Sequence, residues 1–130
     1  MPATIVDSSA WVDFLRGERA AVARVSAPVR EGLAAVTGPI AAEVLSGARS
    51  TGEYRLLNDV LAGLEWVPDT ASLWLRVAEH RFALARSGFQ AGMIDLSIAV
   101  TALDAGRRVL TRNRAFERIR TVVPIELEVF

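Results

Sequence analysis

The sequence predicts an α/β fold in which helices cover both faces of a central, mainly parallel sheet. Two observations favour this fold class. Short apolar segments rich in β-branched residues alternate with longer segments of helical periodicity, a pattern typical of parallel sheets joined by helices. No repeat, low-complexity tract or linker interrupts the 130 residues. We therefore expect one domain that spans residues 1–130 around its own core.

Capping residues mark the helices in the first half of the chain. Ser8 or Ser9 is expected to cap a helix that ends at Gly17. Pro39 stands at an early helix position, where its missing N–H does no harm, whereas Pro28 is expected to break or kink its helix. The expected strands cover residues 4–7 and 35–37, and the other expected helices cover residues 19–33, 38–47 and 51–62.

The second half follows the same alternation. Asp69 or Thr70 is expected to cap a long helix, and a nearly apolar helix closed by Gly106 is expected to be buried on all sides. Pro124 places the last strand at a sheet edge, because proline cannot donate a hydrogen bond to a neighbouring strand. The expected strands cover residues 64–68, 108–111 and 121–125. The long helix is expected to end at residue 86, and two further helices are expected at residues 93–105 and 115–118.

Composition excludes several classes of protein. The absence of cysteine excludes disulfides and cysteine-bound zinc, and the one histidine, His80, cannot form a multi-histidine metal site. With 52% apolar residues and no apolar run long enough for a bilayer, we expect neither disorder nor a membrane segment. The N-terminus lacks the pattern of a signal peptide, so the expected location is the cytoplasm.

Charge gives only a weak indication of what the protein binds. The net charge is zero, so no overall attraction to nucleic acid or membrane is expected. Every basic residue is arginine, and arginine suits phosphate better than lysine does. The C-terminal arginines form either a solvated helix face or a phosphate-contacting surface. They are Arg107, Arg108, Arg112, Arg114, Arg118 and Arg120.

Three acidic residues stand in apolar surroundings: Asp7 at the end of the first strand, Glu43 in a helix, and Asp95 inside the apolar helix. A buried charge is unfavourable unless it is paired, hydrogen-bonded or bound to a cation. Oxygen ligands suit Mg²⁺ or Mn²⁺, and such ions activate water and neutralise phosphoryl charge. Because ligands bind at the carboxyl ends of parallel strands, Thr111 and Asn113 are expected to complete the polar rim of the site, and Ser9 is expected to orient a carboxylate or touch substrate.

Each of these residues also has a simpler interpretation. Asp7 and Ser9 are typical helix caps, and Asn113 is a typical turn residue. Glu43 alone would pair with a surface arginine. Asp95 would be stabilised by its place near a helix N-terminus. The spacing alone does not decide between these interpretations and a metal site.

Four segments together resemble PIN-domain proteins, over nearly the whole chain. The first is an apolar strand that ends in Asp7 and a hydroxyl residue, and the second carries Glu43. The third is a buried helix opened by Asp95, and the fourth is a strand followed by Thr111 and Asn113. The segments are residues 5–11, 40–47, 95–99 and 109–117. Within the family the chain is most similar to VapC-type toxins of type II toxin–antitoxin pairs.

The resemblance implies a three-layer α/β/α fold and a Mg²⁺- or Mn²⁺-dependent endoribonuclease that forms a homodimer and is inhibited by a cognate antitoxin. It implies that Asp7, Glu43 and Asp95 are metal-binding acids. Asn113 occupies a fourth position that is often acidic in the family, and Ala115 stands where a further Asp often occurs. One ion plus a substrate phosphate is therefore expected rather than two tightly held ions.

The leading hypothesis is metal-dependent hydrolysis of an RNA phosphodiester. Asp7 and Asp95 would hold the metal, and Glu43 would share a ligand or orient water. Arg112 and Arg114 are candidate phosphate contacts. Two alternatives remain: a metal-dependent phosphohydrolase acting on small phosphoesters, and a catalytically weak PIN-like interaction module whose acids bind an arginine of a partner.

Overall fold

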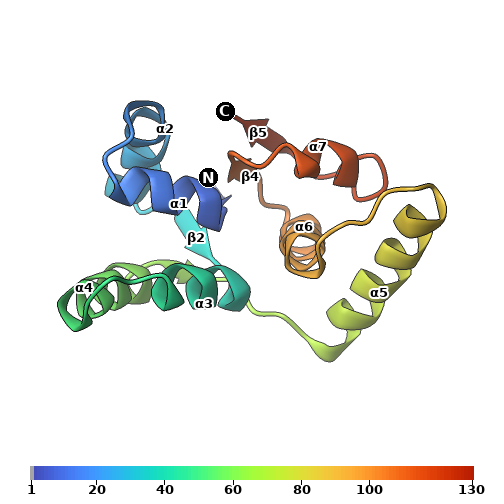
Figure 1. Ribbon diagram of the computed structural model, residues 1–130, viewed down its shortest axis with the longest axis horizontal. Coiled ribbons are helices and arrows are strands. Elements are labelled where there is room, and N and C mark those ends of the chain that lie inside the picture. The colour runs from blue at the N-terminus through green and yellow to red at the C-terminus, as the bar shows by residue number, and fades with distance from the viewer. Residues whose placement is uncertain (1) are drawn as a thin grey trace.

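The computed structural model describes residues 2–130 as a three-layer α/β/α arrangement around a five-stranded, all-parallel sheet (Figure 1). This confirms the predicted fold class. The strands are β1 (Thr4–Val6), β2 (Ala34–Val36), β3 (Glu65–Trp66), β4 (Val109–Thr111) and β5 (Leu127–Val129). The helices are α1 (Ser8–Leu15), α2 (Arg19–Arg30), α3 (Gly38–Ser46), α4 (Thr51–Ala62), α5 (Ala71–Arg86), α6 (Met93–Ala105) and α7 (Ala115–Ile119).

The order of the strands places a topological switch beside β1. The sheet runs β3-β2-β1-β4-β5, so the chain first moves outward from β1 to β3 and then returns to the other side of β1. Two parallel strands on either side of such a switch diverge into helices and leave a crevice at their carboxyl ends. Asp7 follows β1, and Arg112 and Asn113 follow β4. The fold therefore brings two of the predicted site segments together.

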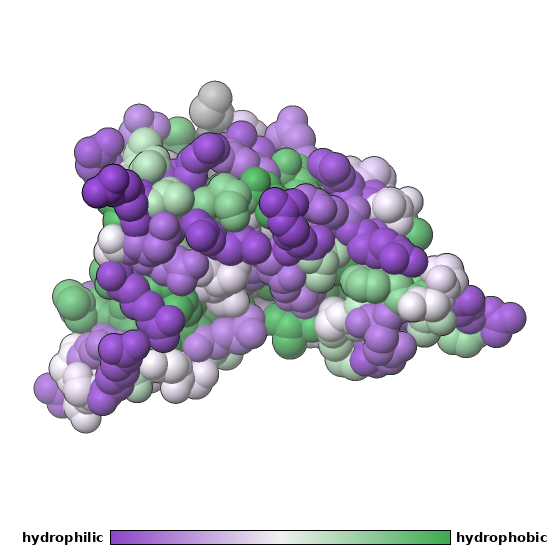
Figure 2. Space-filling model, turned by 45° about the horizontal axis from the view of Figure 1, so that its top comes forward, coloured by the Kyte–Doolittle hydropathy of each residue, from purple (hydrophilic) through white to green (hydrophobic). Residues whose placement is uncertain are grey.

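Burial explains why these short segments form strands. Every residue of β1, β2 and β4 is buried, as expected for strands covered on both faces. Helix α6 is buried from Leu96 to Ala102 and ends at Gly106, which has the left-handed φ of 65° that favours glycine. Figure 2 shows hydrophilic residues spread over most of the visible face, while the apolar core lies inside.

The helix boundaries are close to those predicted from sequence, with two corrections. The predicted bounds of α4 and α6 are those observed. Neither Ser8 nor Ser9 is the cap of α1, because both lie within the helix and Asp7 occupies the N-cap position. Pro28 does not break α2, which continues to Arg30.

The position of the last strand was also predicted wrongly. Residues 121–125 form no strand, because α7 ends in a turn in which the N–H of Val123 bonds back to the carbonyl of Ile119. The apolar pattern there reflects the burial of Val123 and Ile125 in the core. The last strand is β5, which lies at one edge of the sheet and pairs with β4 from Val109 to Thr111.

No helix within residues 2–130 has both the length and the apolar character needed to cross a membrane.

Candidate active site

Asp7 is the most tightly held acid in the crevice between β1 and β4. Its side chain is 2% exposed, although it carries a formal charge. The register that pairs Val6 with Leu110 sets Asp7 beside Thr111. The hydroxyl of Thr111 donates to Oδ2 of Asp7 at 2.7 Å, and that of Ser9 donates to the same oxygen at 2.9 Å. Asp7 occupies the N-cap position of α1, as its simpler interpretation expects, but its carboxylate accepts no helix N–H, so capping does not account for the buried charge.

The two hydroxyls also fix the loop after β4. Oγ of Ser9 accepts the backbone N–H of Arg112 at 3.1 Å, and Oγ1 of Thr111 accepts the backbone N–H of Asn113 at 2.9 Å. Each hydroxyl thus donates to Asp7 and accepts a loop amide. A hydroxyl has one donor and two acceptor lone pairs, so Ser9 and Thr111 each use the donor and one acceptor in this network. These hydrogen bonds couple the position of the Asp7 carboxylate to the conformation of the loop after β4.

Asp95 faces the same crevice from the first turn of α6. Burial, followed by the negative charges of Asp7 and Glu43, raises the pKa of Asp95 to about 6, and a hydrogen bond from Asn113 opposes that rise. The charges of Asp7 and Glu43 thus both act on the carboxyl of Asp95. The amide Nδ2 of Asn113 donates to Oδ2 of Asp95 at 3.2 Å, while its Oδ1 accepts the N–H of Ala115 at 3.0 Å.

Glu43 lies at the outer side of the group. Its side chain is exposed on α3, and its Oε1 accepts the hydroxyl of Ser8 at 3.2 Å. Within residues 2–130 it forms no ion pair with an arginine, so the simpler interpretation of Glu43 as half of a surface ion pair is wrong.

The donor set fits a hard divalent cation. Oδ1 of Asp7 is buried and has no hydrogen-bond partner within residues 2–130, although a buried carboxylate oxygen without a partner is costly. A cation would satisfy this oxygen and would remove the repulsion that raises the pKa of Asp95. Within residues 2–130, no three His, Cys, Asp or Glu side chains form a group that could hold a metal ion in this structure, so joint ligation by Asp7, Glu43 and Asp95 stays a prediction.

The guanidinium of Arg112 is bound to acidic residues other than Asp7, Glu43 and Asp95. Its guanidinium forms ion pairs with Asp13 at 3.3 Å and with Glu18 at 2.9 Å, and it lies 4.7 Å from the ring centre of Phe130. Its role as a phosphate contact stays a prediction, and the observed contacts give it a second role as an anchor of the loop after β4. Arg114 is 76% exposed and pairs only with Glu117 within residues 2–130, so its guanidinium is accessible.

Sequence reasoning missed four contributors to this arrangement. Ser8 was expected only as a cap but binds Glu43, and Asp13 pairs with Arg112. Glu18 caps α2 through the N–H groups of Ala20 and Ala21 and pairs with Arg112 as well. Phe130 donates its N–H to the carbonyl of Thr111 at 3.1 Å. Apart from the local cap of α2 by Glu18, no short motif marks these contacts, because they join segments far apart in the chain.

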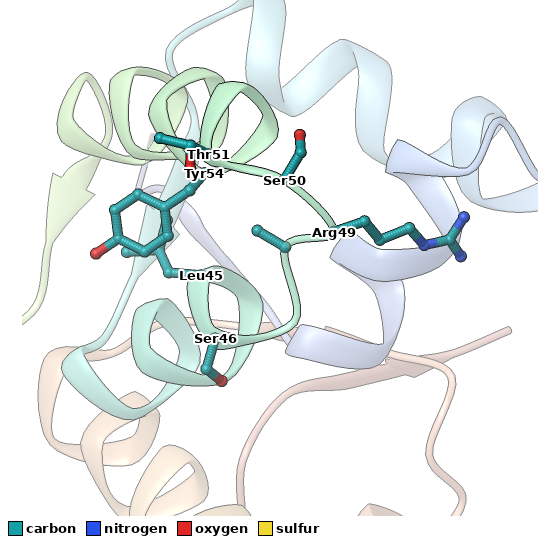
Figure 3. A pocket seen from close by; sticks show the side chains of 7 residues that line it. Leu45, Ser46, Arg49, Ser50, Thr51 and Tyr54 are labelled. Atoms are coloured by element: carbon teal, nitrogen blue, oxygen red, sulfur yellow. The ribbon is translucent and has the colours of Figure 1, made fainter.

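Two pockets lie along α3 and α4. One, of ≈ 570 Å³, is lined by Val12, Leu15, Arg16, Val44, Gly47, Arg49, Glu53, Leu56 and Leu57. The other, of ≈ 400 Å³, is shown in Figure 3, where Tyr54 stands across from Leu45 and Arg49 extends away from both. None of the three acids lines either pocket. The acidic site is thus distinct from both hollows.

Comparison with known proteins identifies the class of protein. A family model described as the PIN domain matches residues 4–122, so the chain belongs to the PIN-domain family. It is 30% identical to VapC ribonuclease Mb1587 of Mycobacterium bovis and to ribonuclease VapC11 of Mycobacterium tuberculosis. Each alignment covers 97% of this chain and 98% of the relative. Within the PIN-domain family, the chain groups with the VapC ribonucleases.

Solved structures agree on the fold. DNA-bound VapBC from Salmonella typhimurium matches with a TM-score of 0.77 at 20% identity, over 99% of this chain and 98% of that one. VapBC2 from Rickettsia felis, bound to a promoter DNA fragment, matches with a TM-score of 0.76 at 20% identity, over 98% of each chain. At this identity the likeness supports the fold alone.

Proposed function

We propose that the chain is the toxin of a type II toxin–antitoxin pair and acts as a Mg²⁺- or Mn²⁺-dependent endoribonuclease. Membership of the VapC ribonucleases supports the reaction class. The observation that carries the metal site is the buried, unpartnered Oδ1 of Asp7 beside an Asp95 whose pKa is raised by its acidic neighbours. Both features disfavour an ion-free, fully charged site.

In this proposal each acid uses one oxygen for positioning and leaves the other for the ion. Ser9 and Thr111 hold Oδ2 of Asp7, Asn113 holds Oδ2 of Asp95, and Ser8 holds Oε1 of Glu43. A bound Mg²⁺ or Mn²⁺ would supply a Lewis acid that activates water and offsets charge on the scissile phosphate. Asn113 contributes no charge, so the ion is expected to be held weakly until the RNA phosphate adds its own oxygens.

The protonation of Asp95 follows from its surroundings. With a pKa of about 6, its carboxyl is mostly ionised at neutral pH and partly protonated at pH 6. Because cation binding requires the ionised form, Mn²⁺ affinity should fall as the pH is lowered through this range. Arg114 is accessible beside Asn113 and is the candidate contact for a phosphate oxygen.

The test compares wild type with Asp95→Asn, using Asp59→Asn as a control because Asp59 is an exposed carboxylate on α4. Calorimetry with Mn²⁺ and cleavage of structured RNAs should both be lost in Asp95→Asn and kept in the control. Equal cleavage by the wild type and Asp95→Asn would reject the site. Turnover of a small phosphoester without RNA cleavage would favour the phosphohydrolase alternative, and absence of Mn²⁺ binding would favour an interaction module.

An antitoxin partner is supported by solved relatives that are themselves described as toxin–antitoxin complexes. We propose that its apolar anchor occupies the ≈ 570 Å³ pocket between α1, α3 and α4. Ser8 and Glu43 lie on two of these helices, so an arginine of the same segment would reach the acids. Leu56→Ser should weaken capture of the co-expressed antitoxin, whereas Val22→Ser, at an exposed apolar residue outside the pocket, should not.

A homodimer is the remaining part of the proposal. Leu75 and Phe82 are 70% and 66% exposed on α5 and lie seven residues apart, on one face of the helix. Exposed large apolar residues at this spacing are typical of a surface that another chain covers. Light scattering of the wild type should give twice the chain mass, and Phe82→Glu should give a monomer. A monomeric wild type would reject the dimer.

A further inference from the structure

A group of arginines that includes Arg114 lies on the Asp95 side of the site. Arg81 belongs to α5, Arg114 directly precedes α7, and Arg118 lies within α7. Phe89 lies between them, in the turn that joins α5 to α6. In Figure 1 this connection runs beneath α7 on its way to α6, in agreement with the contact between Arg118 and Phe89. We call Arg81, Phe89, Arg114 and Arg118 the Phe89 surface.

Two arginines of the Phe89 surface are fixed without any acidic partner. The guanidinium carbon of Arg118 lies 5.2 Å from the ring centre of Phe89, and Nε of Arg81 donates to the carbonyl of Ala91 at 3.0 Å. Neither forms an ion pair within residues 2–130. Their positive charges are therefore both oriented and unneutralised, which leaves guanidinium N–H groups for an anionic ligand.

The Phe89 surface is continuous with the acids. Ala91, which holds Arg81, is followed by Gly92, the N-cap of the helix that carries Asp95. A Cβ atom at residue 92 would lie 3.3 Å from Oδ2 of Asp95, so the turn passes directly against that carboxylate. At the other end, Arg114 follows Asn113, whose amide binds Asp95. The Phe89 surface therefore adjoins Asp95 through Gly92 and through Asn113.

We propose that the Phe89 surface binds the backbone of single-stranded RNA that leads into the acidic site. This inference rests on the proposed ribonuclease function and adds where the substrate lies. Oriented guanidinium groups pair with phosphate oxygens, and an arginine stacked on an aromatic ring presents a flat surface on which a base can stack. Glu117, which pairs with Arg114, is the one acid in contact with this surface through an ion pair.

Binding can be tested separately from cleavage. The full chain carrying Asp7→Asn is titrated against a short, unstructured, fluorescent RNA at several salt concentrations, alone and with Arg118→Gln or Arg81→Gln. Each added change should weaken binding by roughly fivefold or more. Each should also lower the slope of log affinity against log salt by about 0.7 for each lost phosphate contact. Arg30→Gln, at an exposed arginine on α2 that forms no ion pair within residues 2–130, is the matched control.

Two further variants sharpen the test. Glu117→Gln removes the carboxylate opposing Arg114 and should strengthen RNA binding. Phe89→Leu keeps an apolar side chain against the core but removes the ring below Arg118, and it should weaken binding. It also guards against a loss of fold in Arg81→Gln, because Arg81 bonds to the turn and Phe89→Leu leaves that bond in place.

The outcomes separate this inference from the function on which it rests. If Arg118→Gln and Arg81→Gln bind RNA as Arg30→Gln does, the Phe89 surface is not an RNA contact. If they keep RNA affinity but lose antitoxin binding, the surface binds a protein segment and the inference is overturned. RNA binding that depends on these arginines, without cleavage by the wild type, would support the surface and reject the ribonuclease. No RNA binding by the wild type would overturn both.

Discussion

Asp7 and Glu43 are carboxylates of one site, but the protein holds them in opposite ways. Asp7 is 2% exposed and accepts two hydroxyl groups at 2.7 and 2.9 Å, and both hydroxyls are themselves bonded to backbone amides. Glu43 is exposed and accepts one hydroxyl, that of Ser8, at 3.2 Å. One acid is fixed by the sheet, and the other is attached to the surface of a helix.

This difference shows which part of the site is preorganised. Asp7 loses little freedom when a ligand arrives, because the β1–β4 register and two hydroxyls already set its position. Glu43 can move to meet a ligand, and its charge is screened by solvent. Asp95 is intermediate: it is partly buried and is held by the amide of Asn113. The predictions below test this gradient from the fixed acid to the adjustable one.

The largest effect is expected for Asp7→Asn. The change keeps the shape of the side chain and removes the charge from a buried oxygen, Oδ1, that has no hydrogen-bond partner within residues 2–130. Cleavage should fall by at least about a hundredfold, comparable to the loss of a preorganised electrostatic group at other active sites. Glu43→Gln should cost less, about tenfold, because its position is solvent-screened. If Glu43→Gln lowers RNA cleavage more than Asp7→Asn does, the proposed order from the fixed acid to the adjustable acid is wrong.

The next effect is expected for Thr111→Val, which keeps the volume of a fully buried residue. The change removes the donor to Asp7 and the acceptor of the N–H of Asn113. Activity should fall about 10- to 100-fold, as for other residues that orient a metal ligand. The free energy of unfolding should fall by about 1–3 kcal/mol, because a buried amide loses its partner. Thr111→Ser keeps the hydroxyl and should restore most of both; if it does not, the methyl group rather than the hydroxyl matters.

Sequence reasoning found the acids but could not find how they are held. Asp7, Glu43 and Asp95 stand out because a charge among apolar neighbours is visible in a linear pattern. The family resemblance is confirmed by the PIN-domain match over residues 4–122, whereas the metal-binding roles stay predictions. The bond from Thr111 to Asp7 depends on a strand register between segments 104 residues apart, and local spacing contains no information on register.

The same limit explains the wrong position of the last strand and the unforeseen ion pairs of Arg112. The strand predicted at residues 121–125 has the right alternation of apolar residues, but Val123 and Ile125 are buried without pairing in the sheet. An alternating apolar pattern indicates which residues are buried, but whether the segment pairs as a strand depends on the segments that lie beside it. Arg112 shows this for charges: its attraction to Asp13 and Glu18 arises only after the chain has folded.

A smaller effect is expected in the pH dependence of stability, and it depends on Asp95. Its folded pKa of about 6 lies above the value of 3.8 for the unfolded chain, so between these values the folded state binds more protons. Stability from this group is therefore present at low pH and is lost as the pH rises from about 4 to about 6. Because Asp95 is partly exposed, we expect about 1–2 kcal/mol rather than the full shift.

The measurement is urea unfolding of the wild type and Asp95→Asn at several pH values. The variant lacks this titration, so its stability relative to the wild type should increase between pH 4 and 6 and stay constant above. Mn²⁺ at neutral pH should stabilise the wild type and not Asp95→Asn, since a ligand that binds only the folded state raises its stability. A constant difference across the pH range would show that the acids do not interact as described.

The smallest effect is expected from two neighbouring serines on α1 that hold the two contrasting acids. Ser9→Ala removes the donor to Asp7 and the acceptor of the N–H of Arg112, so activity should fall about tenfold. Ser8→Ala removes one exposed bond to Glu43, at the low end of the roughly 0.5–1.5 kcal/mol of a typical hydrogen bond, and should cost less than about threefold. Both variants delete one hydroxyl from the first turn of the same helix, so each controls for the other. Equal losses in a cleavage assay would mean that Glu43 is held as firmly as Asp7 when RNA is bound, and that the adjustable acid becomes fixed on substrate binding.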